Sequence, residues 1–594
     1  MSKVLLLTIL LTSIFSLSAS AEEIDRSSDA KSEDANQLNG ARDSMKAGNR
    51  KIVGNEQYVH LEQVDGVWWL VDGDGEIFVP TGMNHIGEMY RFADYNRNYW
   101  TKEFGTGIFK DGNINWNGPE VKRWMARVAQ DHREFGFTAI AFHRPQFMPD
   151  EHWEDLEIFY FGKPKLGEIT AKYAARWWGG MPDVFSDEWK ASAEQIVKDY
   201  CQKHKNNRYC LGHTFNDQPD YSINAIRKNQ KGFFHHPWVI DIIKKPGLTR
   251  GKRRWMEILQ RHYATCDEAA SMYGITLNKW EDVGSITEWP KPKDQVQGEM
   301  DQTEMLKLCV EAWLKTHHDL LRKYDPNHLI LGDKIGMGVM GPGWGGGQPP
   351  WIWDIVKKYV DVVFIQSYDF YNQRHRNQLE MVYRKTGLPI INGDHSYGFK
   401  RPKMISVKGV PVNSLEAVGI EYSKYLKGIM NHPYMLGWQT CGYLETWSGV
   451  TDATGQEQGG FFDPFGQPLM EALMHAKAAN EKAVEWHRSA HSFDPAAKSE
   501  LDSSEERADR KTPTSVEELF AALALTEEQW TVFNNLEKDR KAALVRFESL
   551  KGTKLNEAKR DFFAEYGAKI AQLFSPEQLK LWRDYWSNPQ NAKN

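Results

Sequence analysis

The stretch that decides the fold is Leu211-Gly212-His213-Thr214-Phe215-Asn216-Asp217-Gln218-Pro219-Asp220-Tyr221. A strand-forming apolar run stops here at a polar cluster that contains the carboxylate of Asp217. Residues 389–395, Pro389-Ile390-Ile391-Asn392-Gly393-Asp394-His395, repeat the pattern and reach a second carboxylate, Asp394. In a (β/α)8 barrel the catalytic groups lie at the carboxyl ends of the parallel strands. The two stretches therefore predict two strands of one barrel whose ends carry acids.

Helical and short apolar segments alternate through most of the chain. A polar residue follows nearly every predicted strand, which favours a closed barrel over a doubly wound sheet, and no strand is followed by the G-x-G-x-x-G turn of dinucleotide-binding folds. We therefore expect the α/β class and a (β/α)8 TIM barrel. The predicted helices span 120–135, 187–204, 250–273 and 304–324, and the predicted strands 137–142, 209–215, 329–332, 360–365, 389–392 and 435–439.

The ends of the chain differ in character from this alternating region. Lys3, the apolar run 4–17 and Ala19-Ser20-Ala21 are typical of a secretory signal peptide. We expect a signal peptide at 1–21, a disordered leader at 22–55, the barrel with its entry hairpin at 56–488, a linker at 489–514 and a helical segment at 515–594. The sequences Leu525-Thr526-Glu527-Glu528-Gln529-Trp530 and Phe574-Ser575-Pro576-Glu577-Gln578-Leu579 resemble the LTxxQ helical hairpins of exported bacterial proteins. A secreted or periplasmic location follows, and no later segment is long and apolar enough to span a membrane.

Composition narrows the partners. The formal net charge is −6 and the basic residues are scattered, which argues against a nucleic-acid partner. The chain has 23 Trp and 23 Tyr, more than an ordinary core needs. The excess could serve to stack on sugar rings or to fill a large barrel core, and the sequence leaves both explanations open. Five cysteines exclude complete intramolecular pairing and fit no zinc spacing. Cys201 and Cys210 could form a disulfide or remain buried thiols. We expect no metal or other cofactor, and the oligomeric state stays open.

Acids at the predicted strand ends suggest sugar chemistry. Glycoside hydrolysis needs one carboxyl group that protonates the leaving oxygen and a second that attacks the anomeric carbon or activates water. The candidates are Asp217, Asp394, Glu445 and, with less support, Asp369. The first two end predicted strands, and Glu445 follows the last one.

The order of motifs resembles the clan A glycoside hydrolases, most closely the family 50 agarase and beta-galactosidase-like group, over residues 56–485. The motifs are the hairpin, Thr81-Gly82-Met83-Asn84-His85, Leu211 to Gln218, Gly393-Asp394-His395-Ser396-Tyr397-Gly398 and a late Gly437-Trp438 strand. That family carries a strand-four Asn-Glu as acid/base and a strand-seven Glu as nucleophile. The resemblance places the first pair on Asp217-Gln218 and the second acid on Asp394, so both Glu positions are changed.

These changes shape the expected roles. A Gln cannot donate a catalytic proton, so Asp217 is the expected acid and Asp394 the expected base or nucleophile, with Glu445 in reserve. Asp is one methylene shorter than Glu, which is compatible with an inverting reaction and its wider carboxylate separation. Expected substrate-binding residues lie around these acids: Asn84, His85, His143, Arg144, Asn216, Gln218, Gln366, Tyr368, His395, Trp438 and Trp447.

Several of these residues have a structural alternative. His143 and Arg144 could form an ion pair under the barrel mouth, and Tyr368 could touch the nucleophile or be a rim residue. Each ring of Trp438, Tyr443 and Trp447 could pack in the core instead of on a sugar. The Gly-rich run 341–347 lacks the Lys-Ser/Thr ending of a phosphate loop, so we expect a mobile loop over a groove.

The sequence thus predicts a secreted glycoside hydrolase that cleaves a galactan-type polysaccharide, with agarose as the first choice by resemblance. Gln218 supports a first alternative, a barrel that binds carbohydrate without cleaving it. A polysaccharide lyase is a second alternative, and its unsaturated product would absorb in the ultraviolet.

Overall fold

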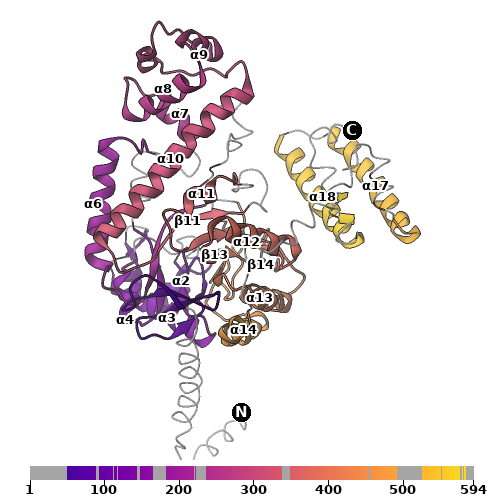
Figure 1. The fold of residues 1–594 in the computed structure, drawn as a ribbon. Coiled ribbons are helices and arrows are strands. Elements are labelled where there is room, and N and C mark those ends of the chain that lie inside the picture. Colours follow the sequence, from indigo (N-terminus) through magenta and orange to yellow (C-terminus); the bar gives the residue numbers. More distant parts are fainter. Residues whose placement is uncertain are drawn as a thin grey trace, which may run out of the picture. The chain divides into compact units, whose positions relative to one another are not determined.

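The computed structural model divides the chain into two compact units, Met1–Pro495 and Ala496–Asn594 (Figure 1). The predicted signal peptide, residues 22–49 of the predicted leader, Arg144, the run 341–347 and the predicted linker after Ala490 lie outside the residues that the structure describes. The prediction of disorder is wrong for the end of the leader, because Arg50–Val53 form a strand that pairs with His60–Val64. Those described are 50–87, 93–110, 113–116, 118–143, 148–164, 182–219, 221, 236–337, 348–451, 455–490, 519, 523, 525–549, 552–574, 578–579 and 581–582.

An eight-stranded parallel sheet forms the centre of the first unit. Its strands follow one another around the sheet in chain order, with β16 next to β5. The outer edges also meet, since Thr138 N donates to Thr81 O at 3.0 Å and His85 N donates to His143 O. The (β/α)8 barrel is therefore confirmed. Its strands are β5 (Thr81–Met83), β8 (Ala139–Ile140), β9 (Phe159–Gly162), β10 (Cys210–Asp217), β11 (Ile330–Gly336), β12 (Val363–Gln366), β13 (Ile390–His395) and β16 (Met435–Thr440).

The helices around the barrel bury one apolar face each. In α6 (Asp187–His204) the Ser186 side chain caps the first turn by accepting from Trp189 N at 3.2 Å. Trp189, Ala193 and Val197 follow at intervals of four and are fully buried, which directs this face to the core. Other helices of this unit are α2 (Arg97–Phe104), α3 (Pro119–Glu134), α4 (Glu151–Asp155), α11 (Ile352–Val356), α12 (Gln373–Thr386), α13 (Leu415–Met430) and α14 (Met470–Arg488).

A small antiparallel sheet precedes the barrel. The predicted hairpin is present, with Val71 of β3 opposite Ile77 of β4. Trp68 N donates to Pro433 O at 2.7 Å, and His487 Nε2 lies 2.8 Å from Trp68 O, so the sheet is fixed to the segment before β16 and to α14. Its strands are β1 (Arg50–Val53), β2 (His60–Val64), β3 (Val67–Val71) and β4 (Ile77–Phe78); two short pairs lie elsewhere, β6 (Phe109–Lys110) with β7 (Asn113–Ile114) and β14 (Tyr397–Gly398) with β15 (Val410–Pro411).

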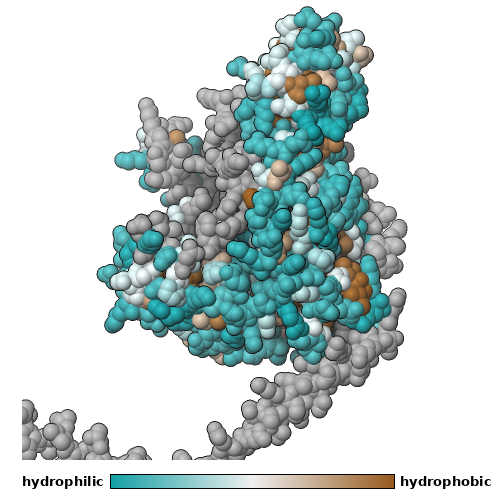
Figure 2. Space-filling model, turned by 90° about the vertical axis from the view of Figure 1, so that its left-hand side faces the viewer, coloured by the Kyte–Doolittle hydropathy of each residue, from teal (hydrophilic) through white to brown (hydrophobic). Residues whose placement is uncertain are grey.

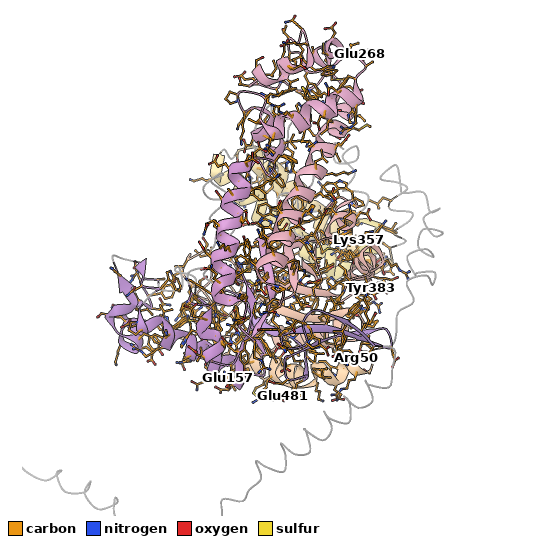
Figure 3. The ribbon with its side chains drawn as sticks, turned by 60° about the vertical axis from the view of Figure 1, so that its left-hand side comes forward. Arg50, Glu157, Glu268, Lys357, Tyr383 and Glu481 are labelled. Atoms are coloured by element: carbon orange, nitrogen blue, oxygen red, sulfur yellow. The ribbon has the colours of Figure 1, made fainter. Side chains whose placement is uncertain are left out.

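A helical insertion separates β10 from β11. It contains α7 (Pro237–Ile243), α8 (Arg250–His262), α9 (Cys266–Tyr273), η4 (Trp280–Ser285) and the first turns of α10 (Gln295–Tyr324). The single helix expected at 250–273 is wrong, because Tyr263 takes extended backbone angles and Thr265 caps a new helix. In Figure 3, Glu268 of α9 lies at the opposite end of the unit from Glu157, which precedes β9. The insertion therefore rises from the carboxyl ends of the strands.

The described part of the second unit is helical. It contains α17 (Glu527–Glu548) and α18 (Gly552–Leu573). Thr526 and Gln529 form a reciprocal capping box at the start of α17. Gln529 Nε2 also donates to Gln578 Oε1 at 2.9 Å, so residues of the two repeated signatures contact each other.

The face in Figure 2 is mostly hydrophilic with small apolar areas. Within the described residues, no helix has the length and apolarity needed to cross a bilayer. The five cysteines are free thiols, including the buried Cys201 and Cys210.

Candidate active site

Asp217 and Asp394 meet at the carboxyl ends of β10 and β13, around a lysine. Lys334, from β11, lies with its Nζ 2.8 Å from Asp217 Oδ1, 2.9 Å from Asp394 Oδ2 and 2.7 Å from His143 Nε2. An ammonium has three N–H donors, and these three atoms are its three acceptors. His143 Nε2 also lies 3.0 Å from Asp394 Oδ2, so the imidazole contacts both the ammonium and a carboxylate. Lys334 thus links four strand ends.

Asp394 is the most enclosed acid of the site, at 1 % exposed. Gly393 lets β13 pass the ring of Phe364, since a Cβ there would lie 2.1 Å from that ring. Tyr368 OH donates to Asp394 Oδ1 at 2.8 Å, and Asn84 Nδ2 lies 3.5 Å from the same oxygen. Burial alone would raise the pKa of Asp394, but the charge of Lys334, with His143, holds it well below its usual value. The carboxylate is therefore ionised.

Asp217 is also ionised. Burial opposes this, but Lys334 and then His143 lower the pKa of Asp217. A carboxyl group with a lowered pKa does not suit the expected role of proton donor at neutral pH. Its neighbour Gln218 has a left-handed backbone, φ 47°, and donates its N–H to Lys334 O at 2.8 Å. Asn216 donates its N–H to Asp333 Oδ1 at 2.9 Å.

The spacing of the two acids bears on the reaction. Both bond one nitrogen, so their oxygens are no further apart than two hydrogen-bond lengths. Inverting glycosidases hold their carboxyl groups about 6.5–9.5 Å apart so that a water fits between them. In this site Lys334 Nζ occupies the space between the acids, which argues against the expected inverting arrangement of this pair.

Glu445 is the third acid, in the loop after β16. It is 2 % exposed; its Oε2 accepts from Trp447 Nε1 at 3.0 Å and lies 3.5 Å from a guanidinium nitrogen of Arg401. Burial raises the pKa of Glu445 to about 7, although Arg401 and the Trp447 hydrogen bond act against the rise. This carboxyl group therefore holds a proton close to neutral pH, as a general acid must.

Some expected binding residues do line the cluster. The rings of His85 and His143 stack with centroids 4.5 Å apart. Asn84 Oδ1 accepts from His143 N at 2.7 Å, and Asn84 Nδ2 donates to Gly393 O at 3.0 Å. The acids are thus surrounded by four of the expected residues, Asn84, His85, His143 and Tyr368. His143 contacts Lys334 and Asp394 in this cluster.

Other expected binding residues lie in the core. His395 and Trp438 are fully buried, with ring centroids 5.3 Å apart, and His395 Nε2 lies 2.7 Å from Asp369 O. This position suits packing and not sugar stacking. Gln366 is also buried, and its carbonyl accepts from Met337 N at 2.8 Å. Asp369 pairs with Arg374 of α12 at 2.6 Å.

Lys334 is the functional residue that sequence reasoning missed. It was visible only as one of the polar residues after a short apolar run. A lysine at a strand end is usually exposed, whereas Lys334 is fully buried. The role of Lys334 follows from the register of β10 and β11, which makes Asp217 the β-ladder partner of Lys334. Strand register cannot be determined from a single sequence.

Two groups of described side chains could ligate a cation. Glu56, His60 and Glu62 lie at the N-terminal sheet, and His213, Asp325 and His328 lie near the amino end of β11. In the second group, His213 Nε2 and His328 Nδ1 lie 2.7 and 2.8 Å from Asp325 Oδ2. These contacts satisfy the group without an ion, and neither group contains the acids described above.

Comparison with known proteins finds agarases among the proteins that are similar to this chain. Beta-agarase B of a Vibrio species is 21% identical over 437 residues, which cover 66% of this chain and 44% of that protein. The chain thus spans less than half the length of this curated relative. Solved structures of an agarase and of an exo-beta-agarase superpose with a TM-score of 0.56 each, at 16% and 17% identity, and cover 74% of this chain and 66% of each of theirs. No family model matches the chain. The resemblance to agarases is confirmed, and the structural likeness establishes the fold.

Proposed function

We propose that this protein is an agarase-like glycoside hydrolase that cleaves a galactan-type polysaccharide. The observation that carries the proposal is a pair of buried acids at the carboxyl ends of the barrel strands, the ionised Asp394 at the end of strand seven and Glu445, which holds a proton near neutral pH, in the loop after strand eight. Paired acids at these ends are what glycoside hydrolysis requires. The similarity to Beta-agarase B supports a galactan as the substrate.

The geometry supports a division of roles that differs from the expected one. Asp394 remains the base or nucleophile, because it is ionised and held by Tyr368 and Lys334. Glu445 takes the proton-donor role from Asp217, because it keeps its proton near neutral pH. Asp217 fixes Lys334 from the other side. In this arrangement Asp394, or a water that Asp394 deprotonates, forms a bond to the anomeric carbon while the glycosidic bond breaks, and the leaving oxygen takes the proton of Glu445.

The test is incubation of the purified protein with a panel of galactans, assayed for new reducing ends and for ultraviolet absorbance. Reducing ends without absorbance support hydrolysis, and Asp394→Asn should abolish them. A product that absorbs in the ultraviolet would point to the lyase alternative and overturn the proposal.

A barrel that binds carbohydrate without cleaving it is the second candidate. The contacts of Lys334 with both acids favour it, because the ammonium occupies the space that a reacting sugar would need. Saturable binding to one galactan without any new reducing ends would identify this function.

We also propose export and a separate C-terminal domain, on the basis of the signal-like residues 1–21 and the composition of 489–514. N-terminal sequencing of the protein recovered from culture medium or periplasm tests the first. Limited proteolysis that cuts between 489 and 514 tests the second.

A further inference from the structure

Two cations lie beside Glu445 on the ring of Trp447. Lys403 Nζ is 4.2 Å from the ring centroid and Arg401 Cζ is 5.6 Å from it. Trp447 is 6 % exposed, and Tyr95 stacks on it with centroids 6.3 Å apart. This ring therefore holds cations by cation–π contact instead of offering a face to a sugar.

The positive charge here is not balanced. Arg401 has one carboxylate within 4 Å among the described residues, Glu445, which is only partly ionised near neutral pH because burial raises its pKa to about 7. Lys403 is exposed and forms no ion pair with any described residue. The nearby Asp463 uses Oδ1 to accept from two backbone N–H groups of its own turn. Lys403 thus has no described carboxylate within 4 Å, and Arg401 has only the partly ionised Glu445.

The cations are held in place by a buried acid. Glu457 is fully buried, and its carboxylate accepts from the N–H groups of Ser406 at 2.9 Å and Gly449 at 2.7 Å, and also from Ile405. Ser448 N donates to Lys403 O at 2.9 Å. These bonds join the segment 401–408 to the loop that carries Trp447. The backbone that carries the two cations is therefore held in place before any ligand binds.

We infer that Arg401, Lys403 and Trp447 form an anion-binding subsite next to Glu445, so that the polysaccharide carries a sulfate ester or a carboxylate. The inference rests on the proposed function, because it names the substrate class of the same site. A guanidinium and an ammonium bind such groups by charge-assisted hydrogen bonds. A neutral galactan would leave Lys403 without an anionic partner and Arg401 with Glu445 alone.

Calorimetric titration with three matched galactan oligosaccharides tests the inference: one sulfated, one chemically desulfated and one that contains a uronate. We expect one of the two anionic ligands to bind at least about tenfold more tightly than the desulfated one, and the gap to shrink as salt is raised. The ligand with the larger gap distinguishes sulfate from carboxylate recognition.

Two substitutions sharpen the test. Lys403→Met should bring the affinity for the anionic ligand to within about threefold of that for the neutral one, and Lys403→Glu should reverse the preference. Lys403 is exposed, so folding is unaffected. Lys424→Met, which removes an exposed lysine of α13, is the matched control and should change nothing.

Equal affinity for the three ligands, or an equal effect of Lys403→Met on all of them, overturns the inference even if the protein hydrolyses neutral galactan. Tight, salt-dependent binding of an anionic ligand without turnover upholds the subsite and contradicts the proposed hydrolysis. The two proposals thus fail separately.

Discussion

Lys334 Nζ donates to Asp394 Oδ2 across 2.9 Å, and the two residues are 0 % and 1 % exposed. Removing one partner of a buried ion pair strongly destabilises the folded protein, because the other charge stays buried and uncompensated. Lys334 compensates two carboxylates, Asp217 and Asp394, so this single side chain controls both the charge state and the stability of the site.

Lys334→Met should lower the free energy of unfolding by about 3–5 kcal/mol and abolish turnover. Denaturant unfolding of the wild type and the variant at pH 7 measures the first effect. The control is Lys424→Met, which makes the same substitution at an exposed lysine and should leave the stability nearly unchanged. A variant as stable as the wild type would show that the carboxylates do not depend on Lys334.

The pH dependence of the same pair has a defined sign. The pKa of Asp394 is lowered in the folded protein, so its contribution to stability is present above its unfolded pKa and is lost as the pH falls. Since Lys334→Met removes the main cause of the lowered pKa, the stability difference between the two proteins should narrow toward acid pH. A difference that is constant from pH 7 to pH 3.5 contradicts this account.

Asp394→Asn should reduce kcat by about 10⁴-fold or more, the scale found when one member of a catalytic unit is removed. The Asn keeps the shape and can accept the bond from Tyr368, and Asp217 still compensates the charge of Lys334, so the fold should survive. Reducing-end assays measure the rate, and circular dichroism checks the fold. Asp369→Asn is a matched control, because this strand-end acid pairs with Arg374 on α12. Full activity in Asp394→Asn would remove this residue from the mechanism.

Glu445→Gln tests the proton donor. The pKa of Glu445 is raised to about 7, so the required protonated form is lost as the pH rises through that value. We expect the activity of the wild type to fall as the pH rises above 7. Glu445→Gln should be about 10²–10⁴-fold less active, and its remaining activity should not show this alkaline fall. The pH profile of kcat/KM decides. If Asp217→Asn removes the alkaline fall and Glu445→Gln retains it, the donor is Asp217.

The barrel was predictable because it depends on local signals. Apolar runs that end in polar residues, and capped amphipathic helices such as α6, are legible without tertiary information. The break between α8 and α9 at Tyr263 was missed because a single extended residue leaves the helical spacing of the apolar residues unchanged. The site was only partly predictable. The strand-end acids Asp217 and Asp394 were found, but burial of Lys334 and the raised pKa of Glu445 arise from contacts between strands and loops far apart in sequence. For the same reason Trp438 and His395 could not be assigned to the core beforehand.

Asp325 offers a prediction on stability that is independent of catalysis. Its Oδ2 accepts from His213 Nε2 and His328 Nδ1, and both histidines are buried. Burial alone would raise the pKa of Asp325, but the hydrogen bonds from these histidines lower it. His328 Nε2 also faces the carbonyl oxygen of Asn207 at 2.8 Å, so both of its ring nitrogens need a proton and the ring is an imidazolium paired with Asp325.

Asp325→Asn should therefore cost about 3–5 kcal/mol at pH 7, because it leaves the imidazolium buried without its counter-charge. The lowered pKa means that the wild-type advantage is present above the unfolded pKa of the acid and is lost as the pH falls. Denaturant unfolding at pH 7, 5 and 3.5 should show the difference narrow toward the lowest pH. Asp354→Asn, which breaks an exposed pair with Lys357, should have no measurable effect. An Asp325→Asn protein that is as stable as the wild type at every pH would show that Asp325 is not the counter-charge of His328.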